Sequence, residues 1–86
     1  MSRHVVVNKK GSMKWVFGWD QPLRSFYLQV HDLGLDPDEN PIVWLGATPK
    51  TEMYEVEHLI QAAMENGLAI DHSYRPVLYQ EKDDGI

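Results

Sequence analysis

Large apolar residues alternate with other residues along two neighbouring stretches between residues 14 and 32. They occupy every second position on both sides of a polar, Pro-containing break: Trp15, Phe17 and Trp19 before it, and Phe26, Leu28 and Val30 after it. Because residues two apart in a strand point to the same face, this pattern predicts two strands that share one buried face.

The break at residues 21–24 has the length of a four-residue hairpin loop in which Asp20 faces Ser25. Trp19 then faces Phe26, and the other large residues of the two stretches face each other in turn. A single register therefore gathers every large side chain on one face, as a hairpin that covers a core requires.

A second hairpin is predicted at the N-terminus, where a β-branched run is followed by the turn sequence Asn-Lys-Lys-Gly-Ser. This sequence is typical of a three-residue loop with Gly11 in the left-handed conformation and Asn8 facing Ser12. Counting back from that pair, we expect Val5 and Val7 to join the aromatic face.

The opposite face of the predicted sheet is too polar for a core and more apolar than an ordinary solvated surface. In the strand predicted at residues 42–47 the first four positions are all apolar, and alternation puts either Ile42 and Trp44 or the other two on this face. Trp44 would supply a large aromatic anchor. We predict a protein interaction face that contains His4, Val6, Val16, Tyr27, Gln29, His31 and Trp44.

Two helical segments are expected near the C-terminus. Apolar residues recur at spacings of three and four within residues 51–66, which follow a Thr-Pro signal at residues 48–49 and are stopped by an Asn-Gly pair at residues 66–67. For residues 73–82 we favour a shorter helix capped by Ser73, and the alternative is a fifth, edge strand at residues 76–79.

These elements predict one α+β domain over residues 1–86. Its four-stranded antiparallel meander packs on one amphipathic C-terminal helix, with a short C-terminal helix or edge strand alongside. The strands are expected at residues 3–8, 13–19, 25–31 and 42–47.

Composition narrows the classes of function. Thirteen Asp and Glu residues against eight Lys and Arg residues give a net charge of −5, which disfavours nucleic acids and anionic membranes as partners. The lack of cysteine excludes disulfides and thiolate chemistry, so self-association is the expected way to stabilise a chain of 86 residues. We see no signal peptide and no apolar run that would span a bilayer, so we expect a cytoplasmic location.

The sequence offers no catalytic constellation, and we expect the protein to have no enzymatic activity and no cofactor. The Ser and Thr residues lack both a strand-turn-helix elbow and a neighbouring base. The carboxylate pairs lie in loops and in the tail, where little would shift their pKa values.

Two residue patterns resemble parts of known metal sites, and both are incomplete. Asp36, Asp38 and Asn40 have the spacing of the first ligands of an EF-hand loop, but Pro occupies the place of the required Gly and the distal Glu is missing. His4 and His31 are expected on the same face of the sheet, but with a strand between them. We therefore predict no metal site.

Two functions remain, and both are binding functions. The main expectation is a protein–protein interaction, including a homodimer, through the predicted interaction face. The alternative is a small-molecule site at the end of the sheet near Gly18, in a corner formed by Trp19, Asp20 and Arg24. The main argument against the dimer is that the C-terminal segment could fold back over the interaction face and cover it.

Overall fold

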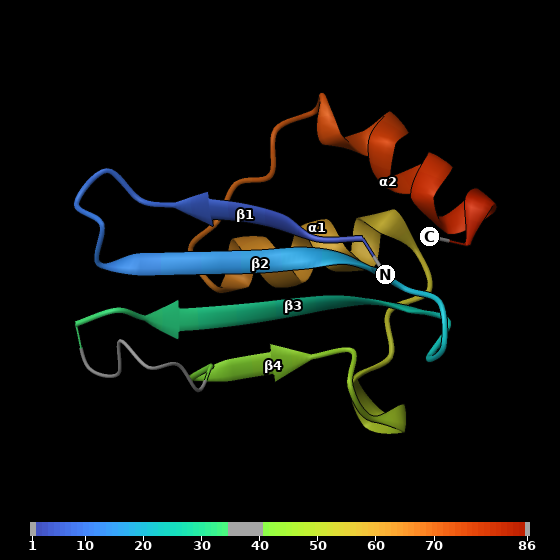
Figure 1. Cartoon of the computed structure of the whole chain (residues 1–86), viewed down its shortest axis with the longest axis horizontal. Helices are drawn as coiled ribbons and strands as arrows, with labels where there is room; N and C mark the ends of the chain where they lie inside the picture. Colours follow the sequence, from blue (N-terminus) through green and yellow to red (C-terminus); the bar gives the residue numbers. More distant parts are fainter. Residues whose placement is uncertain (1, 35–40, 86) are drawn as a thin grey trace.

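The computed structural model describes residues 2–34 and 41–85 of the chain. The strands form one antiparallel sheet in the order β1-β2-β3-β4. Figure 1 shows α1 behind this sheet and α2 beyond its β1 edge. The predicted α+β meander is confirmed, and the C-terminal segment is a helix rather than an edge strand. In chain order the elements are β1 (His4–Val7), β2 (Met13–Asp20), β3 (Ser25–Asp32), β4 (Val43–Leu45), the 3₁₀ helix η1 (Pro49–Thr51), α1 (Val56–Glu65) and α2 (Tyr74–Asp84).

The β2–β3 hairpin has the predicted register. Trp19 pairs with Phe26, and the other pairs of large residues follow in the expected order. The rings of Trp19 and Phe26 pack edge to face with their centroids 4.9 Å apart. The four-residue loop is closed by the backbone N–H of Arg24, which donates to the carbonyl of Gln21 at 3.1 Å. Turn length and hydrophobic pattern thus specify the same pairing.

The β1–β2 hairpin differs from the prediction by one residue. Val6 pairs with Trp15, where Val5 was expected, and Val5 pairs with Val16. Because side chains alternate along a strand, this slip moves every side chain of β1 to the other face. Val6 therefore packs against the core, whereas Val5 and Val7 are half exposed on the far side.

The side chain of Asn8 accounts for the slip. Its Oδ1 accepts hydrogen bonds from the backbone N–H groups of Ser12 and Met13 at 2.9 and 3.1 Å. The backbone N–H of Asn8 donates to the carbonyl of Met13. Asn8 thus pairs with Met13, and the loop has four residues rather than three. Gly11 still takes the predicted left-handed conformation, with φ of 69°.

Helix α1 begins at Val56, and the prediction that it begins at residue 51 is wrong. The chain before it stays extended because Met53 forms an isolated bridge with Phe26. The N–H of Phe26 donates to the carbonyl of Met53, and the N–H of Met53 donates to Ser25 Oγ, both at 2.8 Å. These bonds hold Met53 against the end of β3, where its side chain is buried.

The C-terminal end of α1 follows the prediction. Gly67 has φ of 89°, and the N–H of Leu68 bonds back to the carbonyl of Ala63 at 2.8 Å, which returns Leu68 to the core. The indole N–H of Trp15 donates to the carbonyl of Asn66 at 3.0 Å and ties the helix end to β2.

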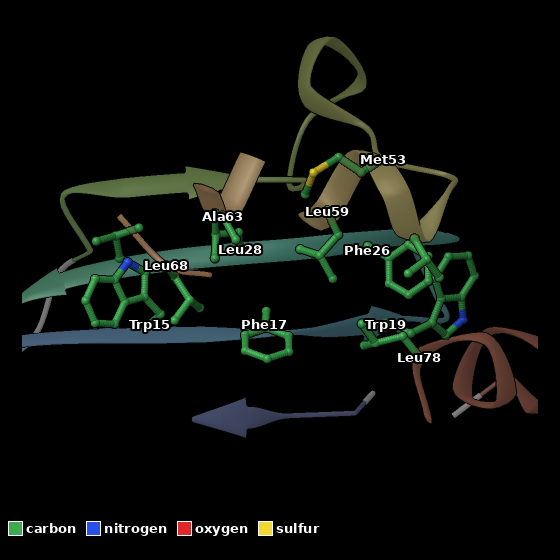
Figure 2. Close-up of a cluster of buried hydrophobic side chains, with 12 residues drawn as sticks. Trp15, Phe17, Trp19, Phe26, Leu28, Met53, Leu59, Ala63, Leu68 and Leu78 are labelled. Carbon is green, nitrogen blue, oxygen red and sulfur yellow. The ribbon is translucent and has the colours of Figure 1, made fainter. Parts of the chain in front are cut away.

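The core lies on the side of the sheet that faces α1. Figure 2 shows side chains from β2, β3, α1 and α2 meeting there. Burial of these large side chains supplies most of the free energy that stabilises a domain of this size. The cluster comprises Trp15, Phe17, Trp19, Phe26, Leu28, Val30, Met53, Val56, Leu59, Ala63, Leu68 and Leu78.

The observed register of β1 and the register expected from the sequence predict different effects of substitutions at Val5, Val6 and Val7. Val6→Ala removes two methyl groups from the edge of the core, so we expect it to lower the free energy of unfolding by about 1–2 kcal/mol. Val5→Ala and Val7→Ala change half-exposed positions and, at a protein concentration low enough to keep the chain monomeric, should cost less than about 0.5 kcal/mol each. Urea denaturation of the three variants decides the matter, and a larger loss at Val5 or Val7 than at Val6 would disprove the observed pairing.

Candidate functional site

The face of the sheet away from α1 is the candidate interaction surface, which we call the open face. Its residues alternate with the core residues along the four strands, and in Figure 1 no described helix crosses it. Both described helices contribute buried side chains to the core side instead. The open face contains Val5, Val7, Lys14, Val16, Gly18, Asp20, Tyr27, Gln29, His31 and Trp44.

The centre and the margin of the open face differ in exposure. Val16 and Tyr27 lie on the two central strands and are 0% and 5% exposed, although no described helix covers them. At the margin, Val5, Val7 and Trp44 are 48%, 49% and 55% exposed. The accessible apolar surface therefore lies on the two outer strands, around a closed centre.

Five residues of the predicted interaction face do lie on the open face. They are Val16, Tyr27, Gln29, His31 and Trp44. The alternation that left two pairs possible in β4 is thus decided in favour of Trp44, which pairs with Gln29.

His4 and Val6 do not belong to the open face, and their assignment to it is wrong. The ring of His4 packs against the rings of Phe17 and Tyr74, each at a centroid distance of 5.4 Å. Its Nε2 lies 2.8 Å from a carboxylate oxygen of Glu81 on α2. The one-residue difference in the register of β1 places both residues on the core side of the sheet. The same difference places Val5 and Val7 on the open face, which the sequence did not predict.

Ser2 lies against the open face at Gly18. A Cβ atom on Gly18 would lie 2.5 Å from the carbonyl oxygen of Ser2, so only glycine allows this approach. The hydroxyl of Tyr27 donates to the same carbonyl at 2.6 Å, and Ser2 Oγ accepts the N–H of Trp19 at 2.7 Å. The sequence pattern carries no signal for this approach of Ser2 to Gly18.

The predicted ligand corner is not assembled as a single site. Trp19 points to the core, where its indole N–H donates to Gln21 Oε1 at 2.8 Å, whereas Asp20 follows it on β2 and points to the other face. Arg24 is exposed in the loop, with φ of 50°. The structure therefore does not bring Trp19 and Asp20 together around one ligand.

The positions of the described residues do not add support to either metal hypothesis. Among the described residues, no three His, Asp or Glu side chains gather as a metal ion would require. His4 and His31 lie on opposite faces of the sheet, so the expectation that they share a face is wrong. The loop residues Asp36, Asp38 and Asn40 lie outside the described residues.

The sequence matches no model of a known protein family, and comparisons with curated proteins and with solved structures gave no match. In residues 2–34 and 41–85, neither helix has the length and hydrophobicity needed to cross a bilayer.

Tyr27 yields a prediction about stability at high pH. Burial raises its pKa above the ordinary value of 10.0, Asp20 and Glu81 add to the rise, and Arg3 opposes it. The folded state therefore holds this proton more tightly than the unfolded state does. The corresponding stability is complete below about pH 10 and is lost as the pH rises through the raised pKa.

We expect Tyr27→Phe to cost about 0.5–1.5 kcal/mol at neutral pH, because the carbonyl of Ser2 loses its hydrogen bond. The variant should also lose less stability than the unaltered protein between about pH 9 and 11. Urea denaturation across this range measures both effects. Tyr74→Phe keeps the ring that packs on Phe17 and serves as the control, and equal alkaline losses in the Tyr27 variant and the unaltered protein would contradict the prediction.

Proposed function

We propose that the protein is a protein interaction domain that self-associates as a two-fold dimer through its open face. The observation that carries the proposal is the exposure of Val5, Val7 and Trp44 on a sheet face that no described helix covers. Polar side chains lie next to these residues on the central strands, because Lys14 pairs with Val7 and Gln29 pairs with Trp44. Apolar side chains with a large aromatic anchor and a polar rim are typical of protein interfaces.

Strand β4 strengthens the case. It lies at the edge of the sheet, and all of Val43–Leu45 is apolar, with Trp44 and the preceding Ile42 both more than half exposed. Edge strands of monomeric proteins usually carry charges or other features that prevent pairing with a second chain. With three residues β4 is too short to offer a long edge, so its contribution to the proposal is the exposed side chain of Trp44 on the open face.

The C-terminal segment, which could have covered the open face, packs elsewhere. Leu78 of α2 is fully buried in the core cluster, and Tyr74 packs edge to face on Phe17. Both contacts lie on the core side of the sheet. The main intramolecular alternative to a dimer is therefore not realised by α2, and this supports a second copy as the covering element.

Charge favours one arrangement of the two copies. Lys14 and Asp20 lie near opposite ends of β2, both on the open face. A two-fold axis parallel to the sheets and perpendicular to the strands sets Lys14 opposite the partner's Asp20, and the reverse pair forms at the other end. An axis along the strands instead brings the Lys14 ends of the two copies together, and the repulsion between these like charges costs free energy. We therefore propose face-to-face packing with antiparallel strands.

The proposal names a protein partner rather than a nucleic acid. The ring of Tyr27 is buried, so among the described aromatic residues of the open face only Trp44 presents an accessible ring for stacking. The net charge of −5 also opposes binding to phosphate backbones. We propose a binding role without catalysis and a cytoplasmic location, both carried over from the sequence.

Sedimentation equilibrium at micromolar concentration tests the proposed dimer. We expect a mass that rises from monomer to dimer with concentration. Trp44→Lys places a charge at the aromatic anchor and should cost about 2 kcal/mol of association, or roughly thirtyfold in the dimer dissociation constant. Met64→Lys makes the same change at an exposed apolar position on α1 and should leave the association unchanged. A strictly monomeric mass for the unaltered protein would overturn the proposal.

The arrangement of the copies has its own control. Lys14→Asp should weaken the dimer because two carboxylates then face each other at each end of β2. Adding Asp20→Lys restores opposite charges and should restore association. Failure of this rescue, with a dimer still present in the unaltered protein, would reject the antiparallel arrangement but not the dimer.

A further inference from the structure

A cavity of about 260 Å³ lies on the core side of the sheet, away from the open face. It is formed between β1, β2 and the segment that connects α1 to α2. Phe17 is fully buried at its floor, whereas Asp71 is exposed and marks its mouth. Its walls include Val6, Phe17, Leu68, Ile70, Asp71 and Tyr74.

The size and lining of the cavity suit a small aromatic ring. An apolar protein cavity of about 150 Å³ is enough to bind benzene, so this cavity has room for a benzene ring with a short substituent. Tyr74 supplies an aromatic wall that is partly exposed, and its ring is held edge to face against the buried ring of Phe17 at a centroid distance of 5.4 Å. A ligand ring can pack against the exposed part of Tyr74 at a similarly favourable geometry.

The mouth of the cavity carries one carboxylate. Asp71 Oδ1 accepts the backbone N–H of Ser73 at 2.8 Å, which fixes the side chain at the start of α2. This hydrogen bond lowers the pKa of Asp71 below its ordinary value of 3.8, so the group is ionised at neutral pH. The described residues that line the cavity include no Lys, Arg or His, and His72 next to Asp71 also lowers its pKa.

We propose that this cavity binds small aromatic amines, with the ring against Tyr74 and the apolar side chains of Val6 and Ile70 and the ammonium group at Asp71. The apolar walls select the ring, and the carboxylate at the mouth selects a cation on a short linker. The site does not depend on the proposed dimer, because β1 turns Val6 toward the cavity and Val5 toward the open face.

The test uses three probes with the same ring: 2-phenylethylamine, the neutral 2-phenylethanol and the anionic 3-phenylpropionate. NMR titration of the unaltered protein follows the methyl groups of Val6, Leu68 and Ile70. We expect saturable shifts in the order amine, alcohol, carboxylate, with affinities in the millimolar range that is usual for ligands of this size. No saturable shift with any probe, or equal binding of the amine and the carboxylate, would overturn the proposal.

Two variants separate the ring from the charge. Asp71→Asn keeps an oxygen that can accept the N–H of Ser73, so it should weaken the amine roughly two- to fivefold and leave the alcohol unchanged. Val6→Phe fills the cavity and should abolish binding of all three probes. Val5→Phe makes the same change on the opposite face of β1 and should have no effect. An equal effect of Val5→Phe and Val6→Phe would overturn the site, and the Asp71→Asn comparison holds even if Val6→Phe does not fold.

Discussion

The pairing of β2 with β3 is the constraint on which the rest of the structure depends. Its loop length and its hydrophobic pattern independently require the same register, and a shift of one residue would expose the three large core side chains of one of the two strands. The cost of such a shift is comparable with the whole stability expected of a domain this small. The other elements are therefore arranged around this hairpin, the outer strands along its edges and the helices on its core side.

The two outer strands and the helices take their positions from this hairpin. Helix α1 covers the aromatic face, and the bridge between Met53 and Phe26 sets where the helix can begin. Because α2 also packs on that side, the other face is left to its own side chains. The central residues of the open face, Val16 and Tyr27, are buried, and the apolar side chains of the outer strands remain accessible. The proposed interaction surface is thus a consequence of where both helices pack.

One strand contributes to both candidate sites. In β1, Val5 and Val7 point to the open face, whereas Val6 lines the cavity beneath the sheet. The side chain of Asn8 decides which valine serves which site, because its hydrogen bonds lengthen the first loop by one residue. A change of register at this loop would exchange the residues of the two sites. Local hydrogen bonding at a turn thereby determines the composition of surfaces some distance away.

The sequence by itself determined the fold class, the order of the strands, the β2–β3 register and the presence of a helix near each predicted position. These features depend on periodicity and turn chemistry, which are local and repeat over many residues. Only the tertiary structure decided the register of β1, the late start of α1, the approach of Ser2 to Gly18 and the cavity at Asp71. Each of these depends on a single side chain or on a contact between distant segments, such as the bond from Met53 to β3, and such contacts leave no periodic trace in the sequence.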